Sequence, residues 1–204
     1  RVMTGWRPAK GNRGTVTIPE VKQGNRWFRQ LYADGQRLAR GRYPAQGFLK
    51  IKTVSKDLMN LSFNSALPQV DLGGQDTEVV VVQNWSITRE IIASSSTEGL
   101  TGKTPMGWVG HGACLAKPRM SAFLEHNLAF VKTPGQWYLD RRTGVLTYQA
   151  APGENPNERQ FVAPMLAQLI DIQGTAAHPV QNLHFKGIGF GDTAFLLPKI
   201  GYNG

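Results

Sequence analysis

The chain has 204 residues, with one cysteine, four histidines and a formal net charge of +9 at pH 7. A single cysteine excludes an intramolecular disulfide framework and a cysteine zinc cluster, and no apolar run approaches the roughly 20 residues of a membrane span. The positive charge favours anionic partners, but no nucleic-acid-binding motif accompanies it, so we expect a solvated basic surface that is densest at 37–42. No metal site, cofactor or nucleic-acid partner is expected.

Short apolar or alternating runs, separated by glycine and proline, indicate an all-β chain. In chain order, we expect strands at 14–18, 27–32, 48–51, 78–82, 85–92, 136–139 and 145–148. The sequence predicts one helix, at 118–130.

Two hairpins are expected from their turn residues. Asp34 and Gly35 suit the positive φ angles of a tight type I′ turn between strands at 28–32 and 37–40. Gly144 suits the left-handed position of a longer loop that joins 137–140 to 145–148.

From about residue 161, short strands recur between glycine and asparagine turns, as in the coils of a parallel β-helix. Alternate side chains would point outward, as we expect for Asp171, His184 and Lys186. The expected interior residues are Ile170, Ile172, Leu183, Phe185, Ile188 and Phe190. Such coils need about three or more repeats for stability, and at most two are present. We therefore expect the chain to be a piece of a longer protein, also because it begins with Arg1 and ends directly after an apolar strand.

Several motifs then carry a family resemblance. They are FLEHN at 123–127, PGQWYLDR at 134–141, TGVLTY at 143–148, RVMTGW at 1–6 and FRQLYADGQR at 28–37. Together they resemble the glycoside hydrolase family 141-like group of right-handed parallel β-helix proteins. Gln136 departs from the glutamate usual in that signature, which argues against a catalytic role at this position.

The resemblance implies an architecture and a function. It implies a β-helix strand remnant at 1–7, an irregular β-sandwich or barrel-like inserted domain at 8–160, and the first coils of a right-handed parallel β-helix at 161–204. It further implies a bacterial, secreted or periplasmic glycoside hydrolase acting on complex polysaccharide, acidic polysaccharide included, with the catalytic residues outside this piece. Fucosidase and xylanase activities occur in the group. The alternatives are a non-catalytic glycan-binding or structural β-helix protein, or a polysaccharide lyase.

Glycoside hydrolysis usually needs a pair of carboxyl groups. Asp171 and Asp192 are the candidates on the outward face of the predicted solenoid, where β-helix enzymes bind glycans. The competing interpretations make Asp171 a solvated strand residue and Asp192 a turn residue. We expect Asp140 to accept hydrogen bonds from its own hairpin loop.

Four further side chains are candidates for substrate contact: Trp108 and His111 in a glycine-rich loop, and His184 and Lys186 on the outward solenoid face. A tryptophan offers a flat apolar face to the C–H side of a sugar ring, although large aromatics such as Trp85 also serve as core anchors. His111 could instead be a hydrogen-bonded loop residue.

Overall fold

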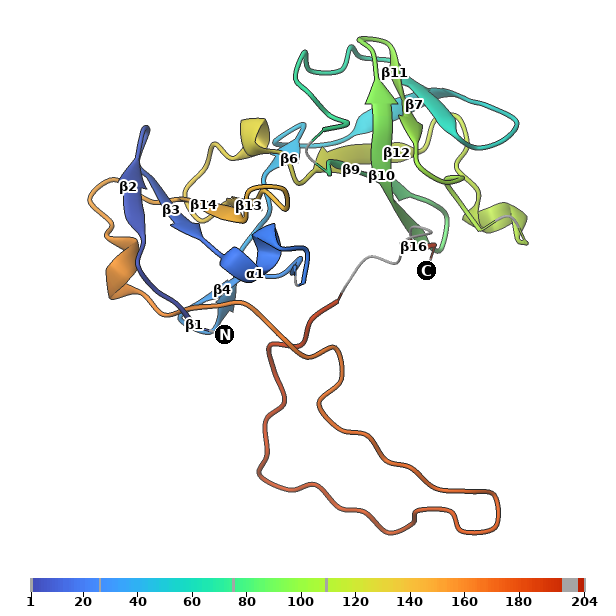
Figure 1. Cartoon of the computed structure of the whole chain (residues 1–204). Helices are drawn as coiled ribbons and strands as arrows, with labels where there is room; N and C mark the ends of the chain where they lie inside the picture. The colour runs from blue at the N-terminus through green and yellow to red at the C-terminus, as the bar shows by residue number, and fades with distance from the viewer. Residues whose placement is uncertain (1, 26, 75, 109, 196–201, 204) are drawn as a thin grey trace.

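The computed structural model describes residues 2–25, 27–74, 76–108, 110–195 and 202–203. As expected, the chain is all-β: its strands form a closed barrel and two small antiparallel sheets (Figure 1). The helical elements of the described residues are short: α1 (Pro19–Lys22) and the 3-10 helices η1 (Gly112–Cys114), η2 (Leu128–Phe130) and η3 (Pro156–Glu158). None of the described helices has the length and apolar character needed to cross a membrane.

Six antiparallel strands close the barrel. In order around it they are β7 (Leu49–Val54), β12 (Ser121–Glu125), β9 (Glu78–Val82), β10 (Ile87–Ser95), β11 (Gly99–Gly102) and β8 (Asn60–Phe63). Side chains alternate between core and surface along β12, so Ala122 and Leu124 point into the barrel while Glu125 points out. Two short strands extend the barrel wall: β6 (Arg42–Tyr43) pairs with β12, and β16 (Tyr202–Asn203) pairs with β10.

The two small sheets share a second core, and we call them the two-sheet body. One sheet has the order β1 (Val2–Met3), β15 (Phe161–Val162), β4 (Tyr32–Ala33) and β5 (Gln36–Arg37). The other has the order β13 (Trp137–Leu139), β14 (Val145–Gln149), β3 (Arg13–Thr17) and β2 (Arg7–Ala9). Trp6, Trp137 and Phe161 are central to their common core.

The barrel is inserted into the two-sheet body, because all its strands lie between β5 and β13 in the sequence. The flanks of the expected inserted domain also meet, since Val2 lies opposite Val162 in the β1–β15 pair. The boundaries at residues 7 and 160 stay predictions.

Both expected hairpins are confirmed. Asp34 and Gly35 have φ angles of 51° and 75°, and Tyr32 lies opposite Arg37 across the first hairpin. Gly144 has a φ of 73° in the loop between β13 and β14. A Cβ at this position would lie 2.5 Å from the carbonyl oxygen of Ile18, so the site needs glycine for space as well as for conformation.

The expected helix at 118–130 is wrong. The segment forms β12 and then η2, separated by His126, whose φ of 64° is incompatible with a continuous helix. The backbone groups of β12 form their hydrogen bonds with β7 and β9, which lie elsewhere in the sequence. The local sequence does not reveal these partners. The strand expected at 27–32 is also reduced to β4. Residues 28–31, between α1 and β4, are buried but form no strand.

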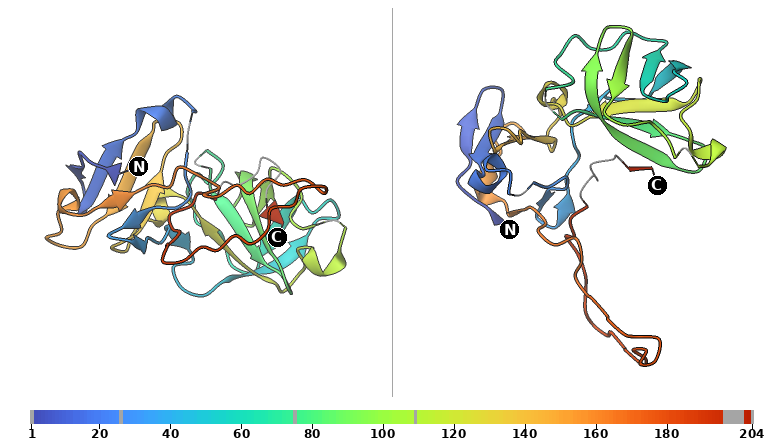
Figure 2. Two further views of the ribbon diagram at one scale, coloured as in Figure 1. Left: turned by 90° about the horizontal axis from the view of Figure 1, so that it is seen from below. Right: turned by 45° about the vertical axis from the view of Figure 1, so that its right-hand side comes forward.

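Residues 164–195 form no strand, and the described residues show no coil of a parallel β-helix. They make a long loop, called the excursion, whose two limbs extend away from the rest of the molecule and back again (Figures 1 and 2). The amide of Ala194 donates to the carbonyl of Leu166 at its base, at 2.8 Å. The expected interior residues of the solenoid are instead exposed, from 36% for Ile170 to 61% for Ile188. Solenoid strands need neighbouring coils to pair with, and the described residues supply none. The part of the expected β-helix at 196–201 lies outside the described residues.

Candidate functional site

Three aromatic side chains gather at one end of the barrel, and we call them the aromatic platform. Trp85 comes from the β9–β10 turn, and Trp108 and His111 come from the loop before β12. Trp85 is 66% exposed and Trp108 is 54% exposed. The His111 ring lies between them, edge-on to Trp85 at 4.9 Å and stacked on Trp108 at 5.9 Å between ring centroids.

Backbone hydrogen bonds hold the platform in place. The amide of Trp108 donates to the Cys114 carbonyl, and the amide of Cys114 donates to the His111 carbonyl, at 3.1 and 2.9 Å. The side chain of Gln83 reaches from the β9–β10 turn and donates to the same Cys114 carbonyl at 2.6 Å. Both loops are therefore tied together, and the rings are positioned before any ligand arrives.

His111 has a structural role as well as an exposed ring. Its Nδ1 accepts a hydrogen bond from the amide of Ala113 at 3.3 Å, which caps η1. Because Nδ1 accepts, the neutral ring carries its proton on Nε2, which can donate to a ligand. The hydrogen-bonded loop interpretation is thus confirmed, and the contact with substrate stays a prediction.

The remaining sequence candidates lie on the excursion, which leaves the barrel and the two-sheet body (Figure 1). Asp171 is exposed and accepts a hydrogen bond from Gln173, while Asp192 is exposed with a φ of 56°. His184 and Lys186 are exposed on the returning limb. The structure therefore brings Trp108 and His111 together, and it places the two aspartates on a different segment. Their catalytic and substrate-binding roles stay predictions.

Of the residues expected to have structural roles, Asp140 has the expected role and Trp85 does not. Asp140 accepts hydrogen bonds from the amides of Arg142 and Thr143 at 2.8 and 3.2 Å, so its expected loop role is confirmed. Trp85 is not a core anchor, because it is exposed, whereas Trp137 and Tyr138 are core residues.

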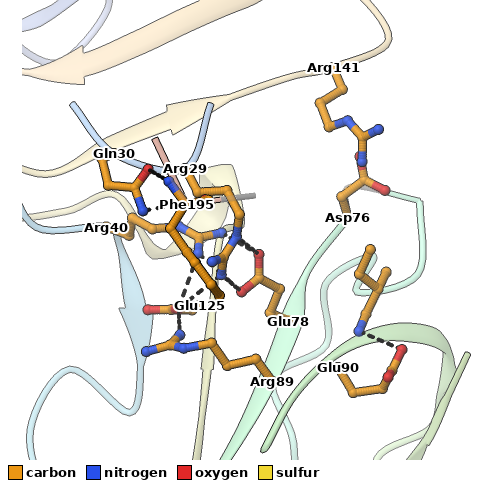
Figure 3. Close-up of polar contacts among 11 residues, drawn as sticks. Arg29, Gln30, Arg40, Asp76, Glu78, Arg89, Glu90, Glu125, Arg141 and Phe195 are labelled. Carbon is orange, nitrogen blue, oxygen red and sulfur yellow. Dashed lines mark hydrogen bonds and ion pairs between the residues drawn. The ribbon is translucent and has the colours of Figure 1, made fainter. Parts of the chain in front are cut away.

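A cluster of charged side chains, which the sequence did not predict as a site, lies between the barrel wall and the two-sheet body. Glu125, Glu78 and Arg89 point outward from the adjacent strands β12, β9 and β10. Strand register places Glu78 directly opposite Glu125. Two arginines, Arg29 and Arg40, approach from the segments that flank the β4–β5 hairpin (Figure 3).

The arginines hold both carboxylates. Glu78 accepts two hydrogen bonds from Arg29, including one from Nε at 3.1 Å, and two from Arg40, at 2.9 and 3.1 Å. Glu125 is contacted by Arg40 at 3.1 Å and by Arg89. The cluster thus has three arginines for two glutamates.

Two carboxyl groups side by side suggest acid–base chemistry, but the arginines remove the proton donor. Burial alone would raise the pKa of Glu78, yet the charges and hydrogen bonds of Arg40 and Arg29 lower it to about 2. Glu78 is therefore ionised at neutral pH and cannot act as the general acid of a glycosidase. By contrast, burial raises the pKa of Glu90, although the Thr104 hydroxyl donates a hydrogen bond to its carboxyl group. Glu90 is only 2% exposed and lies inside the barrel, so a glycan cannot reach it.

Sequence signals for these residues were partial. The dense basic stretch at 37–42 contains Arg40, and the motif at 28–37 begins with Phe28 and Arg29. Nothing local links them to Glu78 or Glu125, which lie 38 and 85 residues beyond Arg40. Among the described residues, no group of three or more His, Cys, Asp or Glu side chains is placed to hold a metal ion.

Comparison with models of known protein families found no match, and neither did comparison with curated proteins. Comparison with solved structures found a similar chain described as a glycoside hydrolase, with a TM-score of 0.73 and 18% sequence identity. The fold resembles part of a glycoside hydrolase. The likeness covers 95% of this chain and 36% of the solved one, so this chain spans about a third of that protein's length.

The likeness also extends into the excursion. The 5% of this chain outside the match is about ten residues, which is fewer than the 32 residues at 164–195. At least part of the excursion therefore falls within the aligned region.

Proposed function

We propose that this chain is part of a carbohydrate-active protein and that the aromatic platform is its sugar-contacting surface. The observation that carries the proposal is the pair of exposed tryptophans, Trp85 and Trp108, fixed around His111 on a fold that resembles part of a glycoside hydrolase. Exposed tryptophans are costly unless they meet a partner, and their flat faces suit the C–H side of a sugar ring while His111 Nε2 offers a donor for a hydroxyl.

The finer proposal is that the whole protein is a glycoside hydrolase of the family 141-like β-helix type, secreted or periplasmic, acting on complex polysaccharide. In this proposal the excursion supplies the first β-helix coils, and its exposed apolar residues pack on coils formed by further chain. Two observations support it. The excursion falls partly within the aligned region, and the segments that flank the proposed inserted domain pair with each other as β1 and β15.

We further propose that the residues described here bind glycan without cleaving it. The ionised state of Glu78 and the enclosure of Glu90 support this. The catalytic pair would then lie elsewhere in the protein, unless Asp171 and Asp192 are brought together when the coils assemble.

The platform is tested by binding. Isothermal titration with neutral xylan and fucosylated oligosaccharides should show that Trp108→Ala and Trp85→Ala each weaken binding by about tenfold, the typical loss for a large aromatic anchor. Phe48→Ala removes another exposed barrel aromatic and is the matched control. Equal losses in all three variants, or unchanged affinity in both tryptophan variants, would contradict the proposal.

Cleavage is tested separately. Chromatography of the polysaccharides after incubation with this chain should show that no sugar is released. Asp171→Asn and Asp192→Asn should therefore have no effect. Release of sugar that either variant abolishes would place catalysis within the chain. A product with an unsaturated sugar end would instead identify a lyase.

A further inference from the structure

A cavity lies beside the charged cluster, and we call it the arginine cleft. It has a volume of about 430 Å³, within the roughly 300–1,000 Å³ of small-ligand sites. Its charged lining consists of Arg29, Arg37, Arg40, Arg42, Arg89 and Glu125. Phe123 and Phe195 add apolar surface.

The charges around the cleft do not balance. Five arginines line it, while the carboxylates in contact with them are those of Glu125 and of the neighbouring Glu78. An excess of three positive charges remains in a partly buried space. Like charges in such a space repel one another strongly, and an anion entering the cleft would relieve this repulsion.

Hydrogen-bond donors also remain available there. Arg37 is exposed and forms no ion pair with any described residue, and Arg89 keeps 27% of its side chain exposed beyond its contact with Glu125. The Nε atom of Arg40 is buried and has no hydrogen-bond partner among the described residues. Guanidinium groups match the planar, two-oxygen geometry of a carboxylate better than that of a single hydroxyl.

The apolar part of the lining suits the remainder of a sugar. The Phe195 ring lies 5.7 Å from the Arg29 guanidinium carbon, and its backbone is held by two hydrogen bonds to the Gln30 side chain, at 3.1 and 3.4 Å. On the other side, Arg42 lies over the ring of Phe123 at 4.2 Å. A ligand in the cleft would thus meet arginines and aromatic rings together.

We propose that the arginine cleft binds the carboxylate of a uronic acid unit in an acidic glycan. This inference rests on the proposed carbohydrate-binding function and narrows its substrate class to acidic polysaccharide. The cleft would select acidic over neutral glycans, while the aromatic platform contacts the rings of acidic and neutral sugars alike.

The experiment compares oligogalacturonate with a neutral oligosaccharide of the same length by isothermal titration. The wild-type chain should bind the acidic ligand at least tenfold more tightly at low salt, and this preference should shrink as sodium chloride is added. Arg37→Gln should reduce the preference several-fold without unfolding the chain, because Arg37 is exposed. Arg89→Gln should do the same, with its folding checked by circular dichroism.

The matched control is Arg142→Gln, which removes an arginine that is 82% exposed on the β13–β14 loop. An equal loss in this control would show a general charge effect and overturn the proposal, as would absence of any acidic preference. Inorganic sulfate or a sulfated neutral glycan that competes as well as oligogalacturonate would overturn the assignment of a carboxylate.

Failure of the platform proposal gives a different pattern. Trp108→Ala should weaken acidic and neutral ligands alike, and Arg37→Gln the acidic ligand alone. If Trp108→Ala changes the affinity for neither ligand while Arg37→Gln lowers the affinity for the acidic ligand, the platform proposal is contradicted and the cleft proposal is supported.

Discussion

The charge on Glu78 should be a large contributor to the stability of this fold. Its side chain is 2% exposed, and its two oxygens accept four hydrogen bonds from Arg29 and Arg40. Glu78→Gln keeps the size of the side chain but removes the charge, so that two buried arginines lose their shared counter-ion. Breaking a buried ion pair in this way typically costs about 3–5 kcal/mol.

The pKa of Glu78 gives an independent magnitude. A fall from 4.5 to about 2 corresponds to roughly 3 kcal/mol of stabilisation of the ionised form. Because the folded-state pKa lies below the unfolded one, this contribution is fully present above about pH 4.5 and is lost as the pH falls towards 2. The cost of Glu78→Gln should therefore be largest at neutral pH and should shrink in acid, where the wild-type carboxyl is itself protonated.

Urea unfolding followed by circular dichroism at pH 7 and pH 3 measures both effects. The control is Glu98→Gln, which removes an exposed carboxylate. The hydrogen bonds of Glu98 are made by its backbone: its amide donates to the Ser96 hydroxyl, and its carbonyl accepts from the amide of Phe63. We expect a loss of about 3 kcal/mol for Glu78→Gln at pH 7 and less than about 0.5 kcal/mol for the control. A loss below about 1 kcal/mol at pH 7, or one that does not change with pH, would refute this account of the cluster.

Two other positions make sharp predictions. Burial lowers the pKa of His126 well below its usual value, so its contribution to stability should be complete above about pH 6.5 and decline as the pH falls. His126→Asn keeps a residue that tolerates the φ of 64° but removes the titrating ring. The urea midpoint of this variant should therefore fall less between pH 7 and pH 5 than that of the wild type. A Cβ on Gly41 would lie 2.7 Å from the Phe130 carbonyl carbon, so Gly41→Ala should destabilise by about 1–3 kcal/mol in thermal unfolding. Gly112→Ala, where a Cβ meets nothing within 4 Å, should change stability little; equal effects would contradict the crowding argument.

Local sequence predicted the elements whose signals are local. The valine run of β9 falls at 78–82, as expected, and Asp34 with Gly35 forms the first hairpin because few residue pairs adopt the two positive φ angles. The segment at 118–130 shows the opposite case. Nothing within it opposes a helix strongly, and β12 forms because β7 and β9 offer partners that are distant in sequence.

The candidate sites follow the same division. Trp108 and His111 could be chosen from one glycine-rich loop, but Trp85 joins them only because the β9–β10 turn lies beside that loop. The basic stretch at 37–42 supplies three arginines of the cleft, but local sequence could not assemble the cleft, because strand register places Glu78 opposite Glu125. Predicting it would have required the pairing of β9 with β12.

The excursion should be dispensable for folding of the part described here. Among the described residues, both hydrophobic cores are built from residues no later than Ala163. The limbs of the excursion meet at Leu166 and Ala194, so a short glycine–serine linker can replace residues 167–193. We expect the free energy of unfolding to change by less than about 0.5 kcal/mol, as for other exposed segments. Binding of the dye ANS should also fall, because exposed apolar side chains are removed.

The same deletion in a longer chain separates two explanations of those apolar residues. If they pack on further β-helix coils, the deletion should strongly destabilise the longer protein while leaving this chain stable, because each coil depends on its neighbours. Replacing the excursion in both chains and measuring urea unfolding tests this directly. Equal tolerance in both chains would show that the excursion is a surface loop and would contradict the β-helix proposal. Destabilisation of this chain itself would instead show that the excursion supports the barrel or the two-sheet body.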